Sequence, residues 1–154
     1  MIDETIFPFE LSPFQKKAVH GITEGHNILV TAHTGSGKTV PAEFAIHYFS
    51  QKGKKIIYTT PIKALSNQKM HEFTNKFPDL SVGLLTGDCK CNPDADVLIM
   101  TTEILRNHLF NSNILDKKNQ GPLEFTMDIE NELGCVVFDE VHYIADPERG
   151  GVWE

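Results

Sequence analysis

An apolar stretch followed by a glycine-containing loop and a Lys-Thr pair constrains the fold of this chain more than any other feature. Ile28–Ala32 has the composition of a β-strand, and the residues after Lys38-Thr39 carry apolar side chains at helical spacing. Gly35 and Gly37 let the intervening backbone wrap closely, so that several N–H groups point at one anion beside a helix N-terminus. Strand, loop and helix in this order predict a nucleoside triphosphate site in an α/β fold.

The loop supplies most of the candidate nucleotide-binding residues, which are His33, Thr34, Gly35, Ser36, Gly37, Lys38 and Thr39. We expect Lys38 to reach the β- and γ-phosphates and the Thr39 hydroxyl to bind Mg²⁺. The strict motif has glycine where this chain has Ala32. The alternative is a flexible loop followed by a solvated lysine, but the apolar strand and the helical pattern on either side favour the triphosphate.

Two acidic residues follow a second apolar stretch, Gly134–Phe138. The stretch predicts a buried parallel strand that places Asp139 and Glu140 at the sheet edge where ligands bind in such folds. Asp139 can hold Mg²⁺, and Glu140 can orient or deprotonate an attacking water. The alternatives are a helix cap or solvated acids. His142, two residues further on, is on spacing alone either part of this site or a polar loop histidine.

Composition narrows the class of protein. The chain has 154 residues, 40% hydrophobic residues and a formal net charge of −7. This length predicts one domain, and the charge argues against a surface that grips nucleic acid everywhere, without excluding a local basic track. No signal sequence or membrane-spanning run is recognisable, which predicts an intracellular protein without a membrane partner. The three cysteines, Cys89, Cys91 and Cys135, suggest neither a disulfide framework nor a zinc site.

Strand-like and helix-like segments alternate, which predicts a parallel sheet with helices on both faces. Expected strands besides 28–32 are residues 55–60, 82–85, 97–101 and 134–138, and expected helices begin at Pro13 and span 37–49, 63–77 and 102–109. Ser12 is expected to cap the first helix, with Gln15 at its third position. Residues 111–131 are expected to form a surface excursion.

Six segments in order resemble superkiller-type RNA helicases, which are superfamily-two DExH-box proteins, and most of all their exosome-associated, antiviral-helicase branch. The segments are residues 32–39, 61–69, 85–88, 100–106, 138–143 and 146–154. The resemblance runs from about Phe9 to Glu154 and weakens only in the excursion at 111–131.

This resemblance implies an ATP-binding, RecA-like P-loop domain spanning residues 1–154, the first of two motor domains, that uses ATP and Mg²⁺. Relative to the family pattern the domain is incomplete at its C-terminus. On that pattern we expect two further parts to lie outside this sequence. One is a motif strand, which the family places between the phosphate-loop strand and the Asp-Glu strand, and the other is the second RecA-like domain with its arginine fingers. We therefore expect apolar edges in the sheet and weak or no activity of the chain alone.

The resemblance also implies roles for single residues. It gives phosphate and metal binding to Lys38 and Thr39, metal binding and water activation to Asp139 and Glu140, and coupling to distant motifs to His142. It also implies that Gln15 reads the adenine, a role that competes with helix capping.

Three further turns resemble motifs that contact the RNA backbone. Their residues are Pro61, Ile62, Lys63, Thr86, Gly87, Thr101, Thr102 and Glu103. All lie at predicted C-terminal strand ends and offer N–H groups, hydroxyls and one cation to phosphates, contacts that carry no base information. The threonines can equally cap helices. Single-stranded RNA and an RNA-decay complex are the implied partners; a catalytically silent binding module and a DNA-directed translocase remain as alternatives.

Overall fold

The computed structural model describes residues 6–33, 35–113 and 127–145. In these residues the helices are α1 (Pro13–Thr23), α2 (Thr39–Gln51), α3 (Lys63–Lys76) and α4 (Thr102–Asn113), and the strands are β1 (Lys55–Thr60), β2 (Val82–Thr86), β3 (Cys89–Cys91), β4 (Val97–Thr101) and β5 (Leu133–Phe138). A 3₁₀ helix, η2 (Val141–Ala145), follows β5. The predictions for Thr34, for much of the 111–131 excursion and for residues 146–154 lie outside the described residues.

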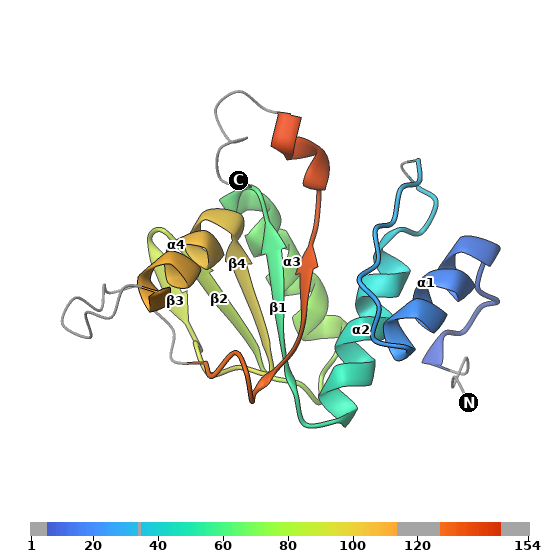
Figure 1. Cartoon of the computed structure of the whole chain (residues 1–154), viewed down its shortest axis with the longest axis horizontal. Coiled ribbons are helices and arrows are strands. Elements are labelled where there is room, and N and C mark those ends of the chain that lie inside the picture. Colours follow the sequence, from blue (N-terminus) through green and yellow to red (C-terminus); the bar gives the residue numbers. More distant parts are fainter. Residues whose placement is uncertain (1–5, 34, 114–126, 146–154) are drawn as a thin grey trace.

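One five-stranded sheet, in the order β3-β2-β4-β1-β5, organises the structure (Figure 1). The pairs β1–β4, β1–β5 and β2–β4 are parallel. This confirms the prediction of an α/β fold built on a parallel sheet. The strands predicted at 55–60, 82–85, 97–101 and 134–138 are all present within a residue, because their apolar composition suits strands buried on both faces.

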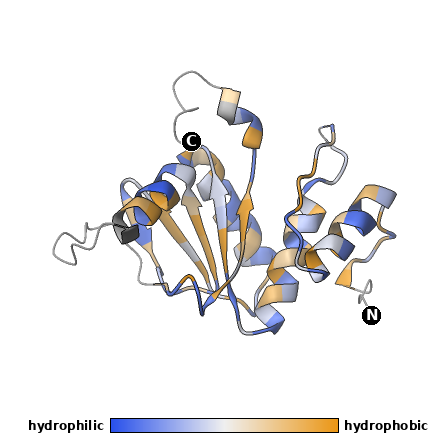
Figure 2. Ribbon diagram, in the orientation of Figure 1, coloured by the Kyte–Doolittle hydropathy of each residue, from blue (hydrophilic) through white to orange (hydrophobic). Residues whose placement is uncertain are grey.

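Helices cover both faces of the sheet, as predicted. On one face, Ile46 of α2 and Phe73 of α3 pack against Ile56, Tyr58 and Ile99 in a fully buried cluster. On the other face, α4 packs against the sheet through a second cluster, formed by Ile57, Leu85, Leu98, Met100, Leu105 and Met127. Helix α1 packs on α2 rather than on the sheet, through a cluster of Leu11, Val19, Val40 and Phe44. Figure 2 shows hydrophobic residues concentrated in the strands.

Strand β3 was not predicted, and it is antiparallel to β2. Thr86 pairs with Cys89, so the loop between the two strands is the dipeptide Gly87-Asp88. Gly followed by Asp is a recognised two-residue hairpin signal, which identifies the hairpin in retrospect. The edge strand is too short and too polar for its own pattern to be read from the sequence.

The prediction of a strand at Ile28–Ala32 is wrong. The segment has no regular secondary structure, Leu29 is 75% exposed, and β5, the strand across from it, pairs with β1 alone among the described strands. In Figure 1 the segment stands apart from the sheet, beside α1 and α2. A strand is stabilised by hydrogen bonds to a neighbour, and no described strand lies next to this segment. Its β-forming composition alone therefore does not fix it as a strand.

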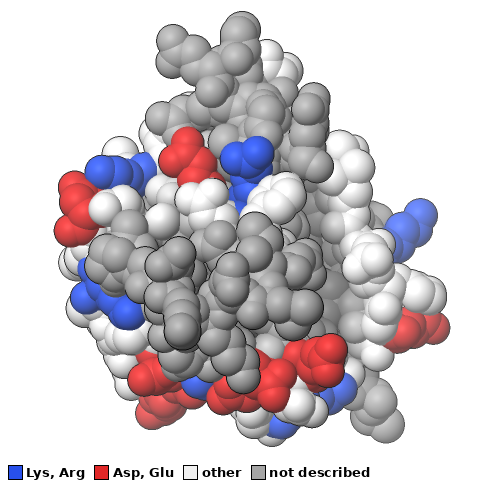
Figure 3. Space-filling model, turned by 60° about the vertical axis from the view of Figure 1, so that its left-hand side comes forward, with Lys and Arg blue, Asp and Glu red and all other residues white. Residues whose placement is uncertain are grey.

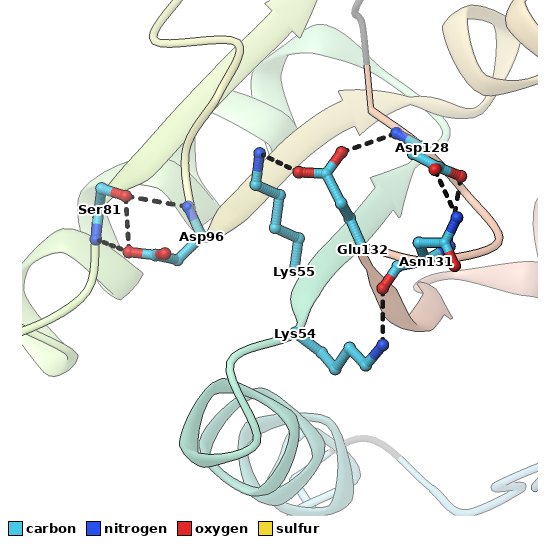
Figure 4. Close-up of polar contacts among 7 residues, drawn as sticks. All are labelled: Lys54, Lys55, Ser81, Asp96, Asp128, Asn131 and Glu132. Carbon is cyan, nitrogen blue, oxygen red and sulfur yellow. Dashed lines mark hydrogen bonds and ion pairs between the residues drawn. The ribbon is translucent and has the colours of Figure 1, made fainter.

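A polar network joins the N-terminal ends of the strands, at the sheet edge opposite the predicted site (Figure 4). Asp96 Oδ2 accepts hydrogen bonds from the backbone N–H and the hydroxyl of Ser81, at 2.8 and 2.6 Å. These bonds, and the nearby ammonium of Lys55, lower the pKa of Asp96 below its ordinary value. Lys55 also pairs with Glu132 at 3.3 Å, joining β1 to the turn before β5. This end of the sheet is thus closed by charge-assisted bonds, while its other end carries the predicted site.

Among the described residues, no helix is both long enough and apolar enough to span a bilayer.

Candidate functional site

The predicted phosphate loop leads directly into α2. Gly35 and Gly37 have φ values of 82° and 81°, a left-handed conformation that glycine adopts without steric cost. Ser36 folds the loop locally by donating a hydrogen bond from its hydroxyl to the His33 carbonyl at 2.6 Å. Lys38 is the N-cap of α2, and no side chain that the structure describes caps this helix end. The uncapped helix N-terminus therefore offers unpaired amide groups and partial positive charge.

The structure brings the loop and the acidic residues together. Lys38, Thr39, Asp139, Glu140 and His142 all line one cleft of about 1170 Å³. This cleft lies between the Ile28–Ala32 segment and β5, and Phe138 at the end of β5 is half exposed to it. Two motifs about 100 residues apart in the sequence thus open onto the same space. Among the described residues of the loop, His33, Gly35, Ser36 and Gly37 are not part of the lining.

Asp139 is held in place from three directions. Its Oδ2 accepts a hydrogen bond from the Tyr58 hydroxyl at 2.8 Å, and its Oδ1 accepts one from the Glu140 N–H at 3.0 Å. Its own N–H donates to the Thr59 carbonyl at 2.9 Å. Burial and the Asp139 carboxylate raise the pKa of Tyr58 far above its ordinary value, so this phenol stays protonated and acts as a donor.

Glu140 has φ 54°, which is uncommon for a residue with a side chain. This conformation turns the chain from β5 into η2, and Tyr143 N–H closes the turn on the Glu140 carbonyl at 3.1 Å. The Glu140 carboxylate lies 3.2 Å from His142 Nδ1. Backbone strain of this kind is concentrated at functional sites, where surrounding structure holds it. The strained turn, the carboxylate and the imidazole form one unit at the edge of the cleft.

Gln15 is 5% exposed and lies against the phosphate loop, with both ends of its amide engaged. Its Oε1 accepts a hydrogen bond from the Ser12 N–H at 2.8 Å, and its Nε2 donates to the Gly37 carbonyl at 3.1 Å. The first bond is part of the expected capping box, which Ser12 and Gln15 form at the start of α1. Gln15 therefore joins the start of α1 to the loop.

The residues predicted to contact nucleic acid fall into two groups. Ile62, Lys63, Gly87, Thr101 and Glu103 line a second cavity of about 430 Å³ at the C-terminal ends of β1, β2 and β4. The remaining three, Pro61, Thr86 and Thr102, are buried beside it. The three turns thus meet at one sheet edge, as their predicted positions after parallel strands require.

Internal hydrogen bonds occupy two of the threonines. The Thr86 hydroxyl donates to Asp88 Oδ1 at 3.0 Å, and the Thr102 hydroxyl donates to the Thr60 carbonyl at 3.3 Å. Thr102 is the first residue of α4, so its hydroxyl anchors the helix start to β1. Helix α4 continues to Asn113, four residues beyond the predicted end at residue 109.

Lys63 is the cation of this cavity, and Asp88 neutralises it. Its Nζ lies 3.0 Å from Asp88 Oδ1, with both side chains largely exposed. Hydrogen bonds from Lys63 and Thr86 lower the pKa of Asp88.

On the face shown in Figure 3, basic and acidic side chains lie interspersed, with acidic residues gathered along the lower margin. This face carries no broad basic surface among its described residues, in line with the net charge.

Two residues of the site were missed from the sequence. Tyr58 lies inside a strand whose apolar pattern predicts only core packing, and a contact 81 positions away in the chain leaves no local signal. Asp88 occupies the hairpin loop after Gly87, and recognising that hairpin would have placed it opposite Lys63.

Comparisons with known proteins agree with this geometry. A family model described as DEAD/DEAH box helicase matches residues 12–154. Antiviral helicase SKI2 of Saccharomyces cerevisiae is 48% identical over 148 residues, which cover 96% of this chain and 10% of that protein. Exosome RNA helicase MTR4 of Homo sapiens is 44% identical, over 96% of this chain and 13% of that protein.

The structure of Mycobacterium smegmatis helicase Lhr bound to ssDNA and AMP-PNP has a TM-score of 0.65 and 27% identity, covering 96% of this chain and 20% of that one. The chain thus spans about a tenth of the length of the curated relatives it matches. The predicted RecA-like helicase fold and the resemblance to superkiller-type RNA helicases are both confirmed. On a family match over nearly all of its residues, the chain belongs to the DEAD/DEAH box helicase family.

Proposed function

We propose that this chain is the ATP-binding part of the first motor domain of an intracellular ATP-dependent RNA helicase. The observation that carries the proposal is the shared cleft, in which Lys38 and Thr39 at the start of α2 face Asp139 and Glu140 at the end of β5. A triphosphate needs donors and a cation on one side and a metal-binding carboxylate on the other. In the whole protein a second motor domain would be required for full activity.

The residues at the cleft fit ATP and Mg²⁺ chemically. Lys38 is exposed and forms no ion pair with any described residue, so its ammonium is available to phosphate oxygens. Gln15, His33, Thr34, Gly35, Ser36 and Gly37 are proposed to complete the nucleotide site. The Thr39 hydroxyl and the Asp139 carboxylate are oxygen ligands of the kind Mg²⁺ prefers. When bound, this ion would neutralise charge on the phosphates. Glu140 is proposed to orient water, and His142, next to it, to link this site to the rest of the motor.

Replacing Lys38 with alanine is expected to weaken Mg²⁺-ATP binding about ten- to a hundredfold. The reason is that the substitution removes one charge-assisted contact to phosphate, worth roughly 1.5–3 kcal/mol. Isothermal titration of the purified chain with ATP and Mg²⁺ measures this change. Lys17→Ala is the matched control, because Lys17 is also exposed but lies on α1, outside the cleft lining. Equal affinities for wild type and Lys38→Ala would remove the phosphate-loop assignment.

We further propose that single-stranded RNA is the nucleic acid, bound through its phosphates at the cavity around Lys63. Support comes from the cluster of Ile62, Lys63, Gly87, Thr101 and Glu103 at one sheet edge and from relatives that are named RNA helicases, such as Exosome RNA helicase MTR4. Pro61, Thr86 and Thr102 are proposed to shape the turns from behind. Association with an RNA-decay complex is proposed from the relative named an exosome RNA helicase.

The Lys63–Asp88 pair predicts two substitutions with opposite effects on RNA affinity. Lys63→Ala is expected to weaken binding of a single-stranded oligouridylate several-fold and to reduce the slope of log affinity against log salt by about one. Asp88→Asn is expected to tighten binding, because it frees the ammonium 3.0 Å away and removes a repelling carboxylate. Fluorescence anisotropy at several salt concentrations measures both, with Lys52→Ala at the far end of α2 as control.

The same titration, together with an ATP hydrolysis assay, distinguishes an RNA helicase from a DNA-directed protein and from a catalytically silent binding module. Changes in the same direction for the two variants would contradict an RNA site at this cavity, and tighter binding of the matching DNA oligonucleotide would favour a DNA-directed protein. RNA-stimulated ATP hydrolysis by the chain alone would exclude a catalytically silent module.

A further inference from the structure

Tyr58 places a polar atom inside an otherwise apolar cluster. The residue is the fourth of β1, and it is 1% exposed. Its ring packs edge-on against Phe73, with 4.9 Å between the ring centroids. A buried hydroxyl costs free energy unless it finds a partner. Here the partner is the Asp139 carboxylate at 2.8 Å, at the end of the adjacent strand β5.

The hydrogen bond restricts the direction in which Asp139 presents its carboxylate. Oδ2 accepts from the Tyr58 hydroxyl and Oδ1 from the Glu140 N–H. Each oxygen can accept about two hydrogen bonds or metal contacts, so one position on each remains after these bonds. Tyr58, Asp139, Lys38 and Thr39 line the same cleft. The Tyr58 ring is fixed by Phe73 behind it, so the donor itself is held in place.

We propose that Tyr58 is a positioning residue for the magnesium ion, whose hydroxyl fixes the Asp139 carboxylate so that its free oxygen positions face the nucleotide cleft. The inference rests on the proposed nucleotide function and adds a residue to it. Groups that hydrogen-bond to a metal ligand typically change metal affinity or activity ten- to a hundredfold when removed. If the hydrogen bond served only to satisfy a buried hydroxyl, its removal would change folding stability and leave metal affinity unchanged.

The test is Tyr58→Phe, which deletes one oxygen and keeps the ring against Phe73. We expect it to raise the apparent dissociation constant of Mn²⁺, used as a spectroscopic substitute for Mg²⁺, about tenfold in the presence of AMP-PNP. Free Mn²⁺ is measured by electron paramagnetic resonance. Binding of AMP-PNP in EDTA is expected to stay as in the wild type. Tyr48→Phe is the matched control, since the Tyr48 hydroxyl also forms hydrogen bonds, to Lys52 and Thr23, away from the cleft.

A double-mutant cycle tests whether Tyr58 acts on the metal ion through Asp139. In an Asp139→Ala background, Tyr58→Phe is expected to have no further effect on Mn²⁺ affinity, because the two residues act through one contact. Wild-type Mn²⁺ affinity in Tyr58→Phe, or an equal loss in the Asp139→Ala background, would overturn the inference. Failure of the proposed function is distinct: AMP-PNP binding would then be insensitive to Lys38→Ala, and the wild type would show no Asp139-dependent Mn²⁺ binding.

Discussion

Replacing Phe73 with alanine is expected to lower the free energy of unfolding by about 3–5 kcal/mol, the usual cost of truncating a buried phenylalanine. Phe73 is 1% exposed and lies between α3 and the sheet, in contact with the rings of Tyr58 and Phe77. Its loss would leave a cavity beside these two rings, and the Tyr58 ring cannot move to fill it because β1 fixes its backbone. Single domains are stable by only about 5–15 kcal/mol, so this is a large share of the total.

Urea unfolding followed by far-ultraviolet circular dichroism measures the effect. Phe9→Ala is the control, since Phe9 is 49% exposed and contacts the ring of Phe7 near the N-terminus. Its expected change is within about 0.5 kcal/mol, the usual range for surface positions. A loss below about 1 kcal/mol for Phe73→Ala would contradict the packing of α3 against the sheet described above.

Local patterns were enough to predict most of the sheet. β1 and β4 are runs of apolar and β-branched residues that begin and end where the sequence predicts, because each is buried on both faces. Their parallel order followed from the alternation with helices. Apolar residues at Val40, Phe44 and Tyr48 likewise predicted the buried face of α2: Val40 and Phe44 belong to the cluster shared with α1, and Tyr48 packs against it.

The error at Ile28–Ala32 has a different origin. The composition of this segment is that of a strand, but strand formation depends on a neighbour that local sequence does not contain. In the described residues β5 has a partner on one edge only, and the cleft occupies the other side. β-propensity therefore reflected the composition of the segment but did not predict its secondary structure.

In the candidate site, too, local sequence predicted some residues and missed others. Spacing and residue type placed Lys38, Thr39, Asp139 and Glu140 at strand and helix ends, and the topology brings those ends to one cleft. The supporting contacts of Tyr58 and Asp88 depend on register between distant strands, which a single sequence does not reveal.

Gln15→Glu is expected to destabilise the nucleotide-free chain by about 3 kcal/mol. The substitution keeps an acceptor for the Ser12 N–H but replaces the Nε2 donor with a carboxylate oxygen facing the Gly37 carbonyl. A buried charge then meets an acceptor, and the carbonyl loses its partner. Nor is the nitrogen's position favourable for the new oxygen, because it would lie 3.1 Å from the Gly37 carbonyl oxygen with no hydrogen between them.

This substitution also separates the two roles considered for Gln15. If its amide mainly holds the phosphate loop to α1, the variant loses stability without nucleotide, and its affinities for ATP and GTP fall by the same factor. If the amide instead reads the adenine, through its second N–H and the second lone pair of Oε1, the variant loses its preference for ATP over GTP. Thermal unfolding and competition titrations with both nucleotides distinguish these results, with Gln68→Glu on the exposed face of α3 as control. Because both ends of the amide are already bonded within the protein, we expect the first result. An unchanged melting temperature combined with lost nucleotide preference would show that the amide reads the base and contributes little to holding the loop.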